Sequence, residues 1–384
     1  MLTQLKSWCA IPSGTYNLPG LSAMADALAD AFSPLGTVRR IDLPTIHEIG
    51  SDGHETSVQL GQLLSITCRP ELPRRVLLAI HFDTVYPAGD PFDHVTEQSD
   101  GTWIGPGVVD AKGGIAVMLF ALGQFERLPI AKHIGWEVIL NPDEEIGSPG
   151  SASFFIEAAR RNTIGLLFEP ALPDGMLVGE RKGSGNFTIV VRGRSAHAGR
   201  DFLAGRSAIV ALSRLIATVA DRAGKLTLNC GLIDGGSAVN IVPDLAIARF
   251  NGRASSDAEA AAVQQLLIDA VAEANQLDGI SATLHGGFTS PPKPLTPASE
   301  SLLNAAQDCG REMGLNLTWR SSGGTCDGNR LAAAGLPLID TLGPVGGNLH
   351  SPREYLLRHT VAERAKLTVG LLARFAEGRI PLTP

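Results

Sequence analysis

The segment Val76-Leu-Leu-Ala-Ile-His-Phe-Asp83 is a run of apolar residues that ends in a histidine and a carboxylate. Segments of the same form recur at Glu137–Glu145, Ile164–Pro170 and Leu336–His350. Continuous apolar runs of this length are typical of strands that helices cover on both faces. Helical patterns lie between them, at 21–32, 113–127 and 151–161. This alternation predicts an α/β fold with a mostly parallel sheet sandwiched by helices.

The segment between the third and the last apolar run has a different order of elements. Strands are expected at 185–193, 225–233, 245–254 and 279–285, with helices at 203–222 and from the capping box Ser256-Asp-Ala-Glu259 to Asn275. The order β-α-β-β-α-β is that of a ferredoxin-like α+β unit. We therefore predict a catalytic domain made of residues 1–180 and 287–384, with a domain of residues 181–286 inserted into it. The proline-rich stretch 286–297 is the expected return linker.

Composition excludes several classes of protein. The 384 residues are 44% hydrophobic and 18% charged, which indicates a globular chain. The net charge is −7 and Lys and Arg form no run, so neither nucleic acid nor a membrane is an expected partner. Met1–Ser13 lacks the features of a signal peptide. The five cysteines are odd in number and widely spaced, so we expect a reducing, cytoplasmic location.

The residues that carry chemistry stand where the predicted strands end. They comprise two histidines and five carboxylates: His81, Asp83, Asp110, Glu144, Glu145, Glu169 and His350. Ligands of parallel sheets bind at the carboxyl ends of the strands, so these side chains are expected to meet. Carboxylates gathered without a partner are costly, which implies a cation. Two histidines with three carboxylates suit zinc, and five ligands suit two ions that share one carboxylate.

The local spacing of these residues suggests different roles for close neighbours in the sequence. In an extended segment His81 and Asp83 face the same way, so Asp83 can fix the tautomer of His81. The adjacent Glu144 and Glu145 point apart, so one can bind metal while the other stays free as a base. Each motif alone is more often structural, and the inference depends on their joint occurrence. Five other histidines, His47, His54, His94, His133 and His359, have no such setting, and Cys326 is interpreted as a small loop residue.

Six blocks of the sequence resemble the M20 metallopeptidase family. They are His81–Pro87, Gly105–Gly114, Asn141–Ser148, Leu167–Pro170, Gly193–Gly199 and Gly347–His350. The resemblance spans about residues 5–375, and Glu169-Pro170 is similar to the glutamate carboxypeptidase branch, the carboxypeptidase G2-like group. It implies two zinc ions per subunit, with Co²⁺ or Mn²⁺ as substitutes. The implied ligand sets are His81, Asp110 and Glu169 for one ion, and Asp110, Glu145 and His350 for the other.

The resemblance also implies roles outside the ligand sets. Glu144 would be the general base, Asp83 would orient His81, and a cis peptide would follow Asp110. His197 would be a lid histidine that reaches the active site of the partner subunit in a homodimer formed through 181–286. The implied substrate-binding residues are Asn240 and Arg253 of the lid and Gly323, Gly324 and Thr325 of a glycine-rich loop. Glycines near 179–185 and 286–294 would allow the lid to hinge.

The activity implied is hydrolysis of an amide bond on the N side of an amino acid with a free carboxylate, as in a carboxypeptidase or dipeptidase. An N-acyl-amino-acid deacylase of the same family and a non-catalytic scaffold of the same fold are the alternatives. A serine hydrolase is not favoured, because no Gly-x-Ser-x-Gly motif occurs. The chain departs from the family pattern at Ala111, at Cys326 and in Phe288–Pro292, which lacks an arginine, so the side-chain specificity stays open.

Overall fold

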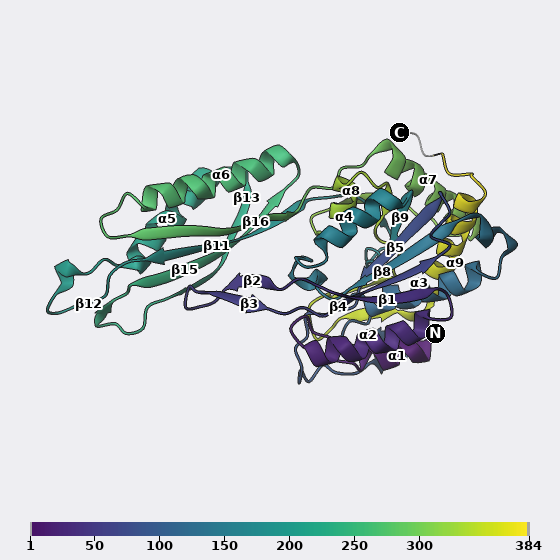
Figure 1. Ribbon diagram of the computed structural model, residues 1–384, viewed down its shortest axis with the longest axis horizontal. Helices are drawn as coiled ribbons and strands as arrows, with labels where there is room; N and C mark the ends of the chain where they lie inside the picture. Colours follow the sequence, from purple (N-terminus) through teal and green to yellow (C-terminus); the bar gives the residue numbers. More distant parts are fainter. Residues whose placement is uncertain (1, 382–384) are drawn as a thin grey trace.

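The computed structural model describes residues 2–381. It has two units, and the chain crosses between them twice, near Arg181 and near Lys293 (Figure 1). The larger unit is built on a six-stranded sheet. In spatial order its strands are β1 (Thr37–Asp42), β4 (Gln62–Cys68), β8 (Gly135–Asn141), β5 (Arg75–His81), β9 (Ile164–Leu167) and β18 (Leu338–Ile339). Strands β8, β5, β9 and β18 run parallel, whereas β4 pairs antiparallel with β8 and β1 pairs antiparallel with β4. The mostly parallel α/β fold is therefore confirmed.

Helices cover both faces of this sheet, as the continuous apolar strands predict. In β5, Val76, Leu78 and Ile80 belong to one core cluster and Leu77 and Ala79 to another, because successive side chains point to opposite faces. The first cluster includes α1 (Leu2–Cys9), α2 (Leu18–Phe32), α3 (Lys112–Phe125), α7 (Pro297–Glu312) and α9 (Arg358–Ala376). The second includes α4 (Ala152–Arg161) and α8 (Gly328–Ala333).

The smaller unit has the ferredoxin-like order that the sequence predicts. Its antiparallel sheet has the order β13 (Thr227–Gly235), β15 (Leu245–Ala254), β11 (Gly183–Arg192) and β16 (Ser281–Ser290). Helices α5 (Ala208–Ala223) and α6 (Asp257–Ala274) pack on one face through a core of their own (Figure 1). Helix α5 begins later than expected because Ser207 caps it and Gly205 precedes the cap, and β16 continues four residues past Gly286 into the expected linker.

The units are joined by more than the two crossing strands. At the crossing, the backbone N–H groups of Arg181 and Lys293 each donate to the other residue's carbonyl, over 2.9 and 3.0 Å. The hairpin of β2 (Ile46–Ile49) and β3 (Glu55–Val58), which the sequence interpretation missed, extends from the larger unit along the smaller one (Figure 1). Arg192 and Arg249 donate to its carbonyls at Gly53 and Ile49 over 2.8 and 2.9 Å. The hairpin therefore bridges the two units.

Short strands and turns complete the chain. The remaining elements are β6 (Thr96–Glu97), β7 (Thr102–Ile104), β10 (Leu177–Arg181), β12 (Ala196–His197), β14 (Ile241–Val242), β17 (Trp319–Ser322), β19 (Gly346–Gly347), β20 (Tyr355–Leu357) and the 3₁₀ turns η1 (Pro129–His133), η2 (Glu144–Ile146) and η3 (Phe202–Ala204). Among residues 2–381, no helix has the length and apolar character that crossing a membrane would require.

Candidate metal centre and active site

The five expected ligands come from separate elements and meet at one edge of the main sheet. His81 ends β5, Asp110 precedes α3, Glu145 lies in η2 after β8, Glu169 follows β9 and His350 follows β19. They form two groups, His81–Asp110–Glu169 and Asp110–Glu145–His350, and within each group one potential ligand atom per residue lies within 4.8 Å of the others. Asp110 belongs to both groups.

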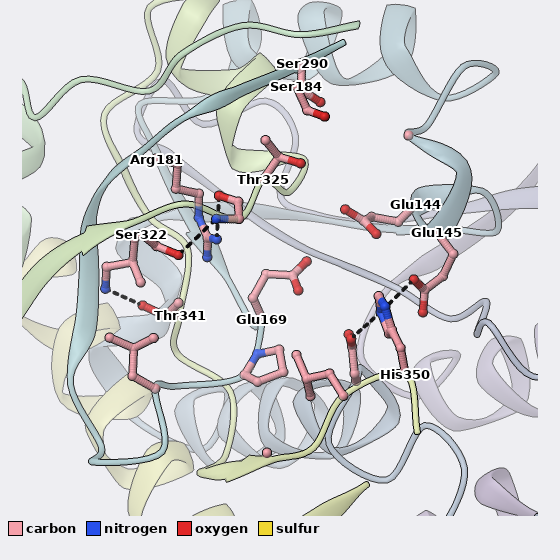
Figure 2. Close-up of a pocket in the computed structure, with 18 of the residues that line it drawn as sticks. Glu144, Glu145, Glu169, Arg181, Ser184, Ser290, Ser322, Thr325, Thr341 and His350 are labelled. Atoms are coloured by element: carbon pink, nitrogen blue, oxygen red, sulfur yellow. Dashed lines mark hydrogen bonds and ion pairs between the residues drawn. The ribbon is translucent and has the colours of Figure 1, made fainter. Parts of the chain in front are cut away.

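The carboxylate of Asp110 faces the two histidines with different oxygens. Its Oδ1 lies 3.1 Å from Nε2 of His81, and its Oδ2 lies 3.4 Å from Nε2 of His350. Nε2 of His350 is also 3.2 Å from Oε2 of Glu145, a pairing visible in Figure 2. A carboxylate with one oxygen turned to each side is the arrangement that bridges two neighbouring ions.

Burial and hydrogen bonds shift the pKa values of the ionisable residues in this cluster. Burial raises the pKa of Glu169 to about 8 and also raises that of Glu145. Hydrogen bonds to Asp110 and Glu145 raise the pKa of His350 to about 10. These carboxylates and histidines therefore compete for protons that a bound cation would replace. A donor set of imidazole nitrogens and carboxylate oxygens fits a borderline divalent ion such as zinc.

Asp83 organises the first turn after β8 as well as His81. Its side chain is fully buried, and its Oδ1 lies 3.3 Å from Nδ1 of His81. The backbone N–H groups of Glu144 and Glu145 donate to its two oxygens over 3.1 Å each, and the Thr15 hydroxyl donates over 2.7 Å. The backbone carbonyl of Asp83 is closer still to Nδ1 of His81, at 3.0 Å. Asp83 thus fixes a histidine through its carbonyl and carboxylate, and its carboxylate fixes the turn that carries the two glutamates.

The loop that carries Asp110 is held by Glu354, a residue that sequence reasoning missed. The buried carboxylate of Glu354 accepts the backbone N–H groups of Gly107, Val109 and Asp110 over 3.0, 2.9 and 3.0 Å. It also accepts the Tyr86 hydroxyl over 2.8 Å. Three backbone donors turned to one carboxylate fix the course of this loop. The peptide between Asp110 and Ala111 is cis, as the family resemblance implied.

Glu144 belongs to neither ligand group, yet its carboxylate points into the same cavity, opposite Glu169 (Figure 2). Burial raises its pKa well above the ordinary value, and the nearby charges of Glu169 and Asp327 act in the same direction. A carboxylate of raised pKa beside a cluster of metal ligands is suited to accept and return a proton.

The cavity has a volume of about 580 Å³ and lies between the two units. The larger unit contributes Glu144, Glu145, Glu169, Arg181, Gly324, Thr325 and His350 to its lining. The smaller unit contributes polar residues of neighbouring strands: Ser184 and Asn186 of β11, Asn251 and Arg253 of β15, and Thr289 and Ser290 of β16. Apart from Arg253, these were missed. Their alternation with apolar Phe187 and Phe250, which face the helices, is the sequence signal that could have identified them.

A buried cationic cluster forms the wall behind Thr325. Arg181 donates to Asp340 over 2.7 and 3.2 Å, and Lys293 donates to the same carboxylate over 2.6 Å. Two cations around one carboxylate leave a positive charge beside the cavity. Cys326 lies in this cluster, and burial raises the pKa of its thiol well above the ordinary value. The thiol is therefore held protonated, which agrees with its interpretation as a structural loop residue.

The other predicted binding residues lie outside this cavity. Gly323 is exposed next to the lining residue Gly324. His197 is exposed on β12, at the end of the smaller unit remote from the ligand cluster (Figure 1). Asn240 is adjacent, since its carbonyl accepts the backbone N–H of Ala198 over 3.0 Å. Within one chain, His197 and Asn240 therefore do not contribute to the cavity in this conformation.

Comparison with known proteins agrees with this geometry. Carboxypeptidase G2 from Pseudomonas sp. (strain RS-16) is 27% identical over 317 residues, which cover 80% of this chain and 75% of the relative. A succinyl-diaminopimelate desuccinylase from Alkalilimnicola ehrlichii is 28% identical over 318 residues, which cover 77% and 82%. The crystal structure of an M20 family metallo-carboxypeptidase from Sulfolobus solfataricus has the same fold, with a TM-score of 0.74 at 17% identity over 98% of this chain and 99% of that one.

Residues 77–374, which carry all of the ligand groups, match the family described as peptidase family M20/M25/M40. The family model matches most of the chain, and the carboxypeptidase and desuccinylase relatives align over most of their length. The protein is therefore an amide-bond hydrolase that belongs to the M20 peptidase family.

Proposed function

We propose that the protein is a di-zinc hydrolase that cleaves the amide bond on the N side of an amino acid with a free carboxylate, in the cytoplasm. The observation that carries the proposal is the pair of ligand groups joined at Asp110, with Glu144 free beside them. His81, Asp110 and Glu169 would hold one ion, and Asp110, Glu145 and His350 the other. When bound, such ions polarise a carbonyl group and make a water molecule more acidic.

The side chains of this enzyme supply the proton transfers and the orientation. Glu144 takes a proton from the attacking water and returns it to the leaving amine, for which its raised pKa suits it. Asp83 holds the imidazole of His81 in one orientation, because both its backbone carbonyl and its buried carboxylate lie next to Nδ1. Because both residues are fixed by backbone hydrogen bonds, the reacting groups meet without further ordering of the chain.

Arg253 is suited to bind the substrate carboxylate. Its Nε donates to Asn251 over 2.9 Å, so the two terminal nitrogens of the guanidinium group stay available. Burial lowers the pKa of Arg253, which indicates a cation partly removed from water without a compensating carboxylate of the described residues. A planar guanidinium group matches a carboxylate through two parallel hydrogen bonds.

A substrate panel tests the proposal. We expect the zinc-loaded enzyme to hydrolyse dipeptides or N-acyl amino acids with a free carboxylate and to reject the same compounds as C-terminal amides. Arg253→Ala should raise KM for the acids by about tenfold or more, the effect of losing a hydrogen bond to a charged group. Equal cleavage of acids and amides would contradict the role of Arg253. Hydrolysis of dipeptides but not of N-acyl amino acids would favour a dipeptidase over a deacylase.

The smaller unit would form a homodimer. Strand β13 is an edge strand of the four-stranded sheet, and Leu232 and Ile233 on it are 51% and 58% exposed. Ile209 and Val210 at the start of α5 are 39% and 50% exposed. Exposed apolar side chains beside an open sheet edge are typical of a surface that pairs with another chain. A second copy of residues 181–286 is the partner that we propose.

Such a dimer would carry His197 of one subunit to the cavity of the other, where it would donate to the developing oxyanion. We expect His197→Ala to lower kcat by about 10²–10³-fold, because a lost oxyanion donor costs that much. Zinc content should not change. Mixing His197→Ala with Glu144→Gln subunits should restore part of the activity, since one mixed site is complete. If subunits exchange and no activity returns, His197 does not act across the dimer.

A further inference from the structure

A second cavity, of about 440 Å³, adjoins the metal centre at Glu145, and Arg253 does not line it. Its walls are mostly apolar, and we name it the acyl groove, defined by Tyr16, Val85, Tyr86, Pro87, Ala88 and Ile146. Glu145 and Ile146 line both this groove and the larger cavity. The two spaces therefore meet beside the ligand group that contains Glu145.

The two spaces differ in whether a cationic side chain lines them. The larger cavity contains the guanidinium groups of Arg181 and Arg253. In the acyl groove, Glu145 is the one charged residue among the described residues that line it, and Glu145 is an expected metal ligand. A carboxylate placed in the groove would lose water and gain no cation, which is costly. An apolar group placed there would be removed from water at no such cost.

The walls of the groove are already fixed in position. The Tyr86 hydroxyl donates to Glu354 over 2.8 Å and lies 3.0 Å from the Ser351 carbonyl, and its ring packs edge-on against Phe92. The Tyr16 hydroxyl donates to Glu48 of the bridging hairpin over 2.9 Å. Val85 directly precedes Tyr86 in the sequence, and it is 39% exposed. Because these side chains are already held in place, little conformational entropy is lost when a ligand binds in the groove.

We infer that the acyl groove receives the substituent on the carbonyl side of the scissile amide, and that it selects uncharged apolar acyl groups against acyl groups that end in a carboxylate. This inference rests on the proposed function, which directs the amino-acid carboxylate to Arg253 in the larger cavity and leaves the adjoining groove, which Arg253 does not line, for the acyl group.

A series of N-acyl derivatives of one amino acid tests the inference. In the wild type, kcat/KM should rise from acetyl to butanoyl to hexanoyl by about fourfold for each methylene that the groove covers. N-pentanoyl, whose terminal methyl group takes the place of a carboxylate oxygen of N-succinyl, should be the better substrate of that pair. Val85→Arg should remove the gain with chain length and shift preference towards N-succinyl. Ala88→Trp should lower kcat/KM for hexanoyl by a larger factor than it lowers kcat/KM for acetyl.

The matched control is Ile156→Arg. Ile156 is also a β-branched residue that is 39% exposed, but it lies on α4 and lines neither cavity. This variant should keep the wild-type acyl preference. Phe202 and Leu203 of η3 are exposed apolar residues of the smaller unit. If Val85→Arg and Phe202→Ser each lower kcat equally for every acyl group, the groove receives these residues from a partner subunit, and the inference is wrong. If N-succinyl substrates are preferred by the wild type, the inference is also wrong although the proposed function stands. Failure to hydrolyse any N-acyl amino acid or dipeptide would instead refute the proposed function.

Discussion

Glu144→Gln is expected to lower kcat by about 10²–10⁴-fold, the range that general acid–base catalysis contributes. Glutamine retains the size of the side chain but cannot take a proton from water. The backbone N–H of Glu144 would still donate to Asp83, so the turn that carries Glu145 should keep its shape. Zinc content and KM should therefore stay close to the wild-type values, since Glu144 belongs to neither ligand group.

A matched control separates this effect from the loss of a negative charge. Glu157→Gln makes the same chemical change on the exposed face of α4, away from the cavity, and should leave kcat unchanged. The measurements are steady-state kinetics and metal analysis of the two variants side by side. A Glu144→Gln enzyme with near wild-type kcat would reject the role of Glu144 as the base. Loss of zinc from that variant would instead make Glu144 a ligand.

The convergence of the metal centre could be predicted because it depends on local rules. Parallel strands place their carboxyl ends at one edge, so residues that follow β5, β8 and β9 had to lie near one another. His81 and Asp83 could be placed on the same side because residues i and i+2 of an extended segment face the same way. The ferredoxin-like unit was also predictable, since its alternating strands and capped helices have strong local signals.

The residues that support the site could not be predicted in the same way. Glu354 holds the Asp110 loop from a position 244 residues later in the chain, and it has no strand-end setting that would mark it. Arg181 and Lys293 meet at Asp340 because the two crossing strands pair there. The hairpin β2–β3 was missed because its strands are short and contain no fully buried residue, so they lack a clear apolar pattern. These contacts depend on tertiary pairing that periodicity does not encode.

Asp110→Asn is the substitution from which we expect the greatest loss of metal. Asparagine has nearly the same shape, but it replaces one carboxylate oxygen with an amide nitrogen and removes the negative charge. Since Asp110 is the member common to both ligand groups, one change should weaken both sites. We expect zinc affinity at each site to fall by more than about 100-fold, the upper effect of removing an outer-shell partner. Activity at ordinary zinc concentrations should fall to background.

Glu169→Gln and His350→Ala provide the comparison, because each belongs to one group. Zinc titration by calorimetry should detect two sites in the wild type, one in each of these variants and none in Asp110→Asn. The order of loss is the informative result. If Asp110→Asn retained one tight site while His350→Ala lost both, Asp110 could not be the shared ligand. The contacts of its two oxygens with different histidines would then serve to orient those rings, and the metal would have to be held without a bridge.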